Sequence, residues 1–308
     1  MELVDHPGPG GEAGPIGLSF STAMPRELVH RRAISEVFIT DMADAGADRV
    51  LVGAQWPRWH VFYGAPPPGV DSALMAETLR QAVIAFAHRR GVPLTHHFLM
   101  PHMGLSVASA KLDAGSPAEI VLELDLLRAA GPSVNPTGLL MAARFLSAGK
   151  EIGRGEASAR ILGAATYERF RSRRPIESDA GGNVPLDPRE VGHESLRNVV
   201  LAAGAHPLSW ALHVDQAHPI FFDHPLDHVP GMLLVEAARQ ALRAASGIPH
   251  ADFASFNATF HSLVELAHAV AVSASLEGNG TDPGSARVEI TRGGSVLMSL
   301  KGALNVRS

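Results

Sequence analysis

An internal repeat constrains the fold of this chain more than any other feature of its sequence. Residues 77–82 read E-T-L-R-Q-A, and residues 236–241, at an offset of 159 positions, read E-A-A-R-Q-A. Val70 also matches Val229 at this offset. Shared helix composition can produce one or two such matches, but a longer match with matching flanks indicates a duplicated unit. We therefore expect two copies of one fold.

Each copy of the repeat lies in a predicted long helix. The first covers residues 71–90, with an Asp or Ser cap at its start and the G-V-P step at residues 91–93 as its stop. The second runs from about residue 231 to residue 246, before G-I-P at residues 247–249. Runs of β-branched and apolar residues predict strands at residues 34–40, 49–56, 105–112, 120–127, 139–145 and 157–164, and again at 198–203 and 210–215.

This order of elements favours an α+β fold, in which an antiparallel sheet wraps around a long central helix in each half. Residues 1–27 lack periodicity and are predicted to be a disordered tail, before a first half at residues 28–166. The charged and turn-forming residues 167–190 are predicted to link it to a second half at residues 191–308. The two sheets would then form one continuous surface, with the helices close together.

Composition argues against several classes of function. The chain has no cysteine, which excludes disulfides, thiolate nucleophiles and cysteine-bound metals and fits the cytoplasm, where we place it. A net charge of -5 gives no reason to expect nucleic acid or an anionic membrane surface as a partner. No apolar run reaches the roughly 18 to 20 residues of a membrane span, and we expect no export signal.

The two copies differ most in the loop before the helix. The second copy carries Asp223, His224, Asp227 and His228 there, whereas the first has G-A-P-P-P-G at residues 64–69. An imidazole that titrates at about pH 6.5 can take up and return a proton, so either histidine is a candidate general base. The alternative is that either histidine only caps the loop or bonds Asp223 or Asp227.

Gly231 and Met232 follow Pro230 at the start of the second helix. The first backbone amides of a helix lack an intrahelical acceptor and can stabilise an oxyanion. The alternative is an ordinary tight turn into a helix. Because no H-E-x-x-H, G-x-G-x-x-G or G-x-S-x-G motif stands in a fitting context, we expect no metal, no cofactor and no serine hydrolase.

Glu77 and Glu236 occupy equivalent places in apolar helix segments, where an unpaired carboxylate is costly to bury. Each could act as a general base or orient a substrate hydroxyl, with a pKa raised by burial. Alternatively, each forms an ion pair with the arginine three residues later, Arg80 or Arg239. These arginines are themselves candidates to bind a phosphorylated substrate, because a guanidinium group can pair with phosphate through two hydrogen bonds.

Five motifs carry a family resemblance. They are V-H-R-R-A-I-S-E-V-F-I-T-D from Val29, Q-W-P-R-W-H from Gln55, L-M-A-E-T-L-R-Q-A from Leu74, F-L-M from Phe98 and F-D-H-P-L-D-H-V-P-G-M-L-L-V-E-A-A-R-Q-A from Phe222. Through them, residues 29–305 resemble the A-factor biosynthesis (AfsA-like) hotdog proteins. The resemblance implies a tandem hotdog fold and an acyltransferase that joins a β-ketoacyl group from acyl carrier protein to the hydroxyl of dihydroxyacetone phosphate. In filamentous soil bacteria this is an early step towards γ-butyrolactone or butenolide signalling molecules.

The family is similar to the β-hydroxyacyl carrier protein dehydratases, which place a loop histidine and a helix acid across a two-hotdog interface. Their histidine matches His224 and their acid matches Glu236, but the spacing is shorter here, so His228 competes for the role. With the dehydratase geometry, His224 should face Glu77 of the other half. Glu236 should face residues 64–68, which hold no histidine. We therefore expect one working site and one degenerate site in each chain.

The predicted site combines these candidates. The catalytic candidates are His224, His228, Glu77 and Glu236, and the substrate-binding candidates are Arg80, Arg239, Gly231, Met232 and Asp227. The predicted partners are β-ketoacyl-acyl carrier protein and dihydroxyacetone phosphate, and the chain is a monomer or a homodimer. Two alternatives stay open, namely a thioesterase or dehydratase of carrier-bound acyl chains and a non-catalytic acyl-binding module.

Overall fold

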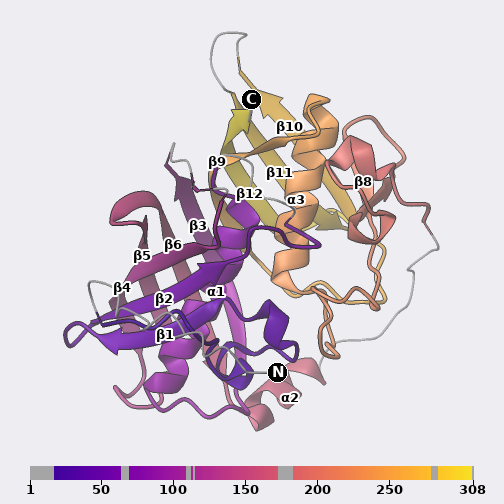
Figure 1. The fold of residues 1–308 in the computed structure, drawn as a ribbon. Helices are drawn as coiled ribbons and strands as arrows, with labels where there is room; N and C mark the ends of the chain where they lie inside the picture. The colour runs from indigo at the N-terminus through magenta and orange to yellow at the C-terminus, as the bar shows by residue number, and fades with distance from the viewer. Residues whose placement is uncertain are drawn as a thin grey trace, which may run out of the picture.

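Figure 1 shows the computed structural model, which describes residues 17–63, 69–108, 112–113, 115–172, 183–278 and 284–306. Within these residues, two halves of the chain repeat one arrangement, in which antiparallel strands surround one long helix. The first half runs from indigo to magenta in Figure 1, and the second from orange to yellow. The expected α+β architecture is confirmed.

The elements follow the same order in both halves. The first half contains η1 (Arg26–Val29), η2 (Ile34–Glu36), β1 (Ile39–Asp44), β2 (Arg49–Trp56), α1 (Ser72–Arg89), β3 (His97–Val107), β4 (Ala118–Ala130), β5 (Gly138–Ser147) and β6 (Lys150–Leu162). A short helix, α2 (Ala164–Arg171), comes next. The second half contains η3 (Pro188–Val191), η4 (Leu196–Asn198), β7 (Leu201–Ala203), β8 (Ser209–Leu212), α3 (Gly231–Ser246), β9 (Ala251–Phe260), β10 (Ala271–Glu277), β11 (Ser285–Arg292) and β12 (Ser295–Val306).

The strands of the described residues form one 12-stranded sheet, in the order β1-β2-β4-β5-β6-β3-β9-β12-β11-β10-β8-β7. The order within the second half mirrors the order within the first around the central pair, β3 and β9. Five residue pairs, from His102 with Thr259 to Ser106 with Ser255, join these two strands. The mirrored order supports the duplication inferred from the repeat, and the sheets form the single surface that was expected.

The two long helices are the buried centres of their halves. Leu79, Ala82 and Phe86 of α1 are fully buried, as are Ala241 and Leu242 of α3. Burying one large apolar side chain contributes about 1.5–3 kcal/mol to folding. The small alanine side chains on both helices also allow close packing, and α1 and α3 contact each other as predicted.

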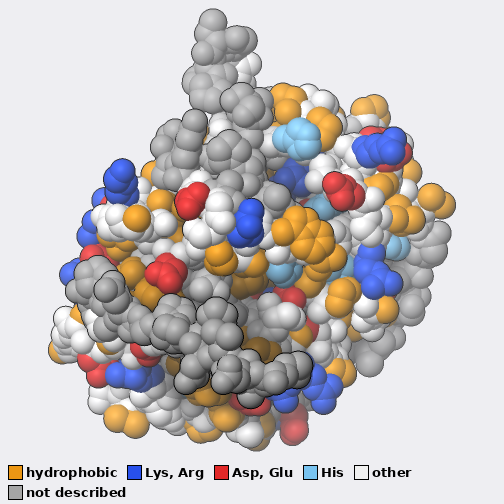
Figure 2. All heavy atoms as spheres, viewed as in Figure 1, with side chains coloured by type: hydrophobic (Ala, Val, Ile, Leu, Met, Phe, Trp, Pro, Cys, Tyr) orange, Lys and Arg blue, Asp and Glu red, His pale blue; other side chains and the backbone are white. Residues whose placement is uncertain are grey.

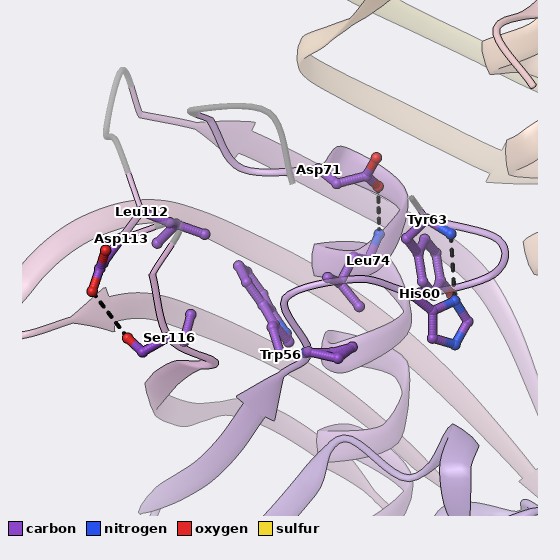
Figure 3. Close-up of a pocket in the computed structure, with 10 residues that line it drawn as sticks. Trp56, His60, Tyr63, Asp71, Leu74, Leu112, Asp113 and Ser116 are labelled. Atoms are coloured by element: carbon purple, nitrogen blue, oxygen red, sulfur yellow. Dashed lines mark hydrogen bonds between the residues drawn. The ribbon is translucent and has the colours of Figure 1, made fainter. Parts of the chain in front are cut away.

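Both long helices lie where the sequence predicts them. Asp71 caps α1, because its Oδ1 accepts hydrogen bonds from the amides of Ala73 and Leu74, the second of which is drawn in Figure 3. α3 ends before Gly247, whose φ of 67° suits glycine. Most predicted strands overlap observed ones, although β3 and β6 begin several residues earlier than predicted.

The segments predicted as the first strand of each half begin instead as the 3₁₀ turns η2 and η4. A glutamine side chain from the central helix explains the difference. Gln81 accepts a hydrogen bond from the amide of Phe38 and donates one to the carbonyl of Glu36. Gln240 of α3 makes the corresponding pair of bonds in the second half. These backbone groups are satisfied by a helix side chain, so they need no neighbouring strand.

Two segments predicted to be irregular are partly ordered. Residues 17–27, predicted as tail, pack against the first half, and Leu18 among them is buried. α2 covers the beginning of the predicted linker at residues 167–190. η3 begins within its last residues, at Pro188. Residues 1–16 and 173–182 of these two predictions lie outside the described residues. The exact boundaries of the two halves stay predictions.

Acidic and basic side chains are interspersed on the face shown in Figure 2, without a large area of one sign. Among the residues that the structure describes, no helix is both long and apolar enough to cross a membrane. Nor does any group of three or more His, Cys, Asp or Glu side chains in the described ranges lie together in a way that could hold a metal ion.

Candidate active site

A cavity of about 410 Å³ lies where the two halves meet. Its walls are α1, β3 and α2, together with the loop before α3, the first turn of α3 and the residues after β9. The predicted site residues that line it are His224, His228, Arg80, Gly231 and Met232. The predicted site residues outside this lining are Asp227, Glu77, Glu236 and Arg239.

His224 is held by a carboxylate. Its Nδ1 lies 2.6 Å from Oδ1 of Asp223, and Oδ2 of Asp223 accepts a hydrogen bond of 2.7 Å from the amide of Arg32. Burial acts to raise the pKa of Asp223, but His224 and Arg31 outweigh it and lower this pKa to about 2. Since ionised Asp223 can only accept, the hydrogen lies on Nδ1 of His224, and neutral His224 keeps Nε2 as a proton acceptor.

His228 has a similar partner. Its Nδ1 lies 2.7 Å from Oδ1 of Asp227, which also accepts a hydrogen bond of 2.8 Å from the hydroxyl of Tyr167 in α2. Arg171, also in α2, pairs with Oδ2 of Asp227 at 2.9 Å. Both carboxylate oxygens of Asp227 are therefore engaged within the protein. Asp227 holds His228, and its predicted contact with substrate stays a prediction.

Glu77 is fully buried and bound by two arginines. Nη2 of Arg31 and Nη2 of Arg80 each lie 2.7 Å from its Oε1. Burial acts to raise the pKa of Glu77, but the two guanidinium groups outweigh it and lower the pKa to about 2. The predicted rise in pKa is wrong, and the alternative, an ion pair with the arginine three residues later, is confirmed. A carboxylate with so low a pKa has little tendency to take up a proton, so Glu77 is a poor general base.

Glu236 repeats this pattern in the second half. Its Oε2 accepts a hydrogen bond of 2.7 Å from Arg239, and its Oε1 lies 2.7 Å from Nε2 of His193. Burial acts to raise the pKa of Glu236, but Arg239 and His193 lower it far below its ordinary value. The predicted rise in pKa is wrong here as well, and the ion-pair alternative is again confirmed.

Arg239 does not reach the cavity. Its exposed fraction is 2%, and it pairs at 2.7 Å both with Glu236 and with Asp71, the residue that caps α1. Two buried carboxylates neutralise this guanidinium group, so the prediction that Arg239 binds a substrate phosphate is wrong. Arg80, its counterpart in the repeat, is the arginine that lines the cavity.

His224 and Glu77 were expected to face each other, and in the structure Arg31 connects them. Arg31 binds Glu77, and its Nη1 lies 3.6 Å from Oδ1 of Asp223, the partner of His224. The contact predicted for Glu236 falls on residues 64–68, outside the described residues.

The first backbone amides of the two long helices have different partners. At α1, Asp71 accepts from two amides, and Oδ2 of Asp252 accepts a hydrogen bond of 3.2 Å from the amide of Ser72. At α3, no side chain caps the start, and the amides of Gly231 and Met232 bond none of the described residues. Both residues line the cavity, so α3 presents two free donors at the positive end of its helix dipole.

Several lining residues were missed by the sequence interpretation, namely His30, Arg31, His97, Arg160 and Tyr167. His30 and Arg31 belong to the V-H-R-R motif, which carried the family resemblance but was given no role. The two adjacent basic residues of this motif could have indicated a place in the site. Tyr167, which stacks on His97 with ring centroids 3.8 Å apart, falls in the predicted linker and gave no signal.

His30 is a neutral histidine in a rare backbone conformation, with a φ of 52°. Its Nε2 lies 3.0 Å from Nε2 of His88, whose Nδ1 lies 2.7 Å from the carbonyl oxygen of Val92. Because a carbonyl only accepts, neutral His88 donates from Nδ1, and His30 donates from Nε2. Burial, with smaller contributions from Arg80 and the neighbouring histidines, lowers the pKa of His30 to about 3.

Stability is expected to fall as the pH drops from 7 to 5. Burial lowers the pKa of His218 to about 4 and that of His30 to about 3, whereas both titrate at about 6.5 in an unfolded chain. Below pH 6.5 the unfolded chain therefore binds more protons, which costs on the order of 1 to 2 kcal/mol per histidine by pH 5. Urea unfolding at pH 7, 6 and 5 measures this loss. The loss should be smaller in His30→Gly, whose glycine suits a φ of 52°, and an equal loss in that variant would contradict the assignment to His30.

Residues 17–163 and 176–301 match the family model of the A-factor biosynthesis hotdog domain. A relative from Streptomyces virginiae, named 2-oxo-3-(phosphooxy)propyl 3-oxoalkanoate synthase, is 37% identical over 237 residues, which cover 73% of this chain and 77% of the relative. A relative of the same name from Streptomyces coelicolor is 35% identical over 230 residues, covering 73% of each chain.

Solved structures share the fold at low sequence identity. The putative oleoyl thioesterase from Lactobacillus plantarum matches with a TM-score of 0.54 and 13% identity, covering 86% of this chain and 100% of that one. A putative thioesterase II from Thermobifida fusca matches with a TM-score of 0.51 and 12% identity, covering 87% of this chain and 96% of that one. At such identities the likeness concerns the fold alone.

Proposed function

Because the chain belongs to the A-factor biosynthesis hotdog family, we propose that it transfers a β-ketoacyl group from acyl carrier protein to the primary hydroxyl of dihydroxyacetone phosphate. The family resemblance and the tandem hotdog fold expected from the sequence are thereby confirmed. The name of these relatives describes the ester that this transfer forms. The ester is an early precursor of γ-butyrolactone-type signals, and we place its formation in the cytoplasm.

The observation that carries the proposal is the content of the cavity between the two halves. It combines a carboxylate-held histidine, a partly ion-paired arginine and two free helix amides. Apolar side chains line the remaining wall and suit an acyl chain, among them Phe98, Met100, Met103, Phe260 and Leu263. A transferase needs these groups together, because a proton, an acyl chain and a phosphate must be handled in one space.

The proposed step begins at His224. Its Nε2 takes the proton of the acceptor hydroxyl, and the hydroxyl oxygen attacks the carbonyl carbon of the thioester. The amides of Gly231 and Met232 donate hydrogen bonds to the oxyanion that forms. The carbon–sulfur bond then breaks, and His224 returns the proton to the departing thiolate. One ester and one thiol result, without an acyl-enzyme.

The amide assignment is supported by the other helix start. Where Gly231 and Met232 of α3 have free amides, the amides of the first turn of α1 bind the carboxylate oxygens of Asp71 and Asp252. Within this protein, a helix start of the same design therefore binds negatively charged oxygen. In the working site that oxygen would belong to the substrate.

Arg80 is the proposed phosphate-binding residue. Its Nε and Nη2 donate to Glu77, whereas its Nη1 bonds none of the described residues and can donate to a phosphate oxygen. Loss of one charge-assisted bond costs about 1.5–3 kcal/mol, so Arg80→Gln should raise KM for dihydroxyacetone phosphate by about 10- to 100-fold. Steady-state kinetics at saturating thioester would measure this. KM for the thioester should stay within a factor of about three, and a change confined to that KM would contradict the assignment.

The central experiment is mass spectrometry of the protein incubated with a β-ketoacyl carrier-protein thioester, with and without dihydroxyacetone phosphate. The expected product is the acylated triose phosphate or the butenolide phosphate that condenses from it, formed only with the acceptor. Free acid or dehydrated thioester without the acceptor would instead favour the thioesterase or dehydratase. Binding of the thioester without any turnover would favour an acyl-binding module.

A further inference from the structure

Arg31 belongs to the first half of the chain but reaches the loop before α3 in the second half. Its Nη2 lies 2.7 Å from Oε1 of Glu77, and its Nη1 donates a hydrogen bond of 2.7 Å to the carbonyl of Ile220. The same Nη1 lies 3.6 Å from Oδ1 of Asp223. With 7% of its side chain exposed, Arg31 fills a mostly buried position between the halves.

The backbone before Arg31 explains this reach. His30 ends η1 in the left-handed conformation, with a φ of 52°, and Gly192 ends η3 with a φ of 71°. In both halves the next side chain contacts the glutamate of the central helix, as Arg31 does for Glu77 and His193 does for its counterpart. The contact is therefore a duplicated feature, but only the first half supplies a guanidinium group that can continue to a second carboxylate.

That second carboxylate belongs to Asp223, and the first half holds it from several directions. The amides of Arg32 and Ala33 donate to its Oδ2 at 2.7 Å and 3.4 Å, and Arg31 lies beside its Oδ1. Oδ1 in turn faces Nδ1 of His224 at 2.6 Å. The orientation of the base in the second half thus depends on three consecutive residues of the first half.

We propose that Arg31 is a positioning residue for His224, which acts through Asp223 and is anchored by Glu77. This inference rests on the proposed function only in assigning turnover to His224. It gives Glu77 a defined task, because its carboxylate fixes the guanidinium group and transfers no proton. It also explains how an acid of one half and a histidine of the other serve one site without direct contact.

The charges around His224 make the proposal measurable. On the same loop, His224 faces the carboxylate of Asp223. The charged or titratable groups near it from the first half are His30 and Arg31, with Arg80 behind Glu77. Removal of the Arg31 charge takes away a cation that disfavours the imidazolium form of His224. The midpoint of the acid limb of the pH–rate profile should therefore rise.

The test compares Arg31→Gln with His193→Gln, the matched change in the second half. Arg31→Gln is expected to lower kcat by about 10- to 100-fold and to raise the midpoint of the acid limb by about 0.5 to 1 pH unit. NMR titration of the His224 ring should give the same shift without turnover. His193→Gln removes a similar contact to a helix glutamate and should change neither kcat nor the midpoint of the acid limb. Arg31→Lys should restore part of kcat and part of the shift in that midpoint.

The outcomes separate the two proposals. An unchanged His224 titration in folded Arg31→Gln, or an equal shift in His193→Gln, would overturn the role of Arg31. If Arg31→Gln does not fold, Arg31→Lys decides by the same titration, where a wild-type value would overturn the proposal. A wild-type protein that forms no acylated triose phosphate would refute the proposed function, while the titration would still test the contact.

Discussion

Replacement of His224 by glutamine is expected to lower kcat for acyl transfer by about 10³-fold, within the range that general acid–base catalysis supplies. Nε2 of His224 is the proposed proton acceptor, and Asp223 holds the ring at 2.6 Å through Nδ1. Glutamine keeps a polar side chain of similar length but cannot take up a proton. Rates with saturating β-ketoacyl thioester and dihydroxyacetone phosphate would measure the loss, and circular dichroism would check the fold.

His228→Gln is the matched control, because His228 lies on the same loop, lines the same cavity and also faces an aspartate. We expect its kcat to fall by less than about 10-fold. The aspartate that faces His228 also binds Tyr167 and Arg171 of α2. These contacts favour a structural role for His228 in the wall of the site. A larger loss in His228→Gln than in His224→Gln would transfer the role of base to His228.

Arg239→Met is expected to lower the free energy of unfolding by about 3–5 kcal/mol, the usual cost of leaving buried charges unpaired. The substitution removes a buried cation that pairs with both Glu236 and Asp71, at a position that is only 2% exposed. Methionine fills most of the volume but carries no charge. Urea unfolding followed by circular dichroism would measure the change.

Arg80→Met tests the same position of the repeat in the first half. Arg80 is partly exposed, and Glu77 keeps Arg31 as a second partner when Arg80 is removed. We expect a loss of only about 1 kcal/mol, with the main effect on binding of the phosphorylated acceptor. Similar destabilisation by both substitutions would mean that the two arginines have the same structural task.

Local signals in the sequence were sufficient for much of the fold. Asp71 and Gly247 mark a helix start and a helix end through chemistry that depends on a few neighbouring residues. The repeated glutamates fixed the correspondence between the halves. The turns before β1 and β7 were missed because the partner of their backbone is a glutamine distant in sequence, in the central helix.

The candidate site was harder to predict, because burial and pairing depend on the whole fold. From spacing alone, Arg80 and Arg239 are equivalent, yet one lines the cavity and the other is enclosed between two carboxylates. The direction of the pKa shift of Glu77 required knowledge of Arg31, which is not a neighbour in sequence. Both loop histidines line the cavity, because one short motif carries them together, and their catalytic roles stay predictions.

The hydrogen bonds between β3 and β9 limit how this enzyme can move. In many enzymes whose site lies between two domains, the domains rotate about a hinge to admit substrate and release product. Here the strands of both halves belong to one sheet, and such a rotation would break the five residue pairs that join β3 to β9. We therefore expect entry of the acyl chain and release of the ester to involve local movements of α2 or of the loop that carries His224, without a rotation of one half against the other.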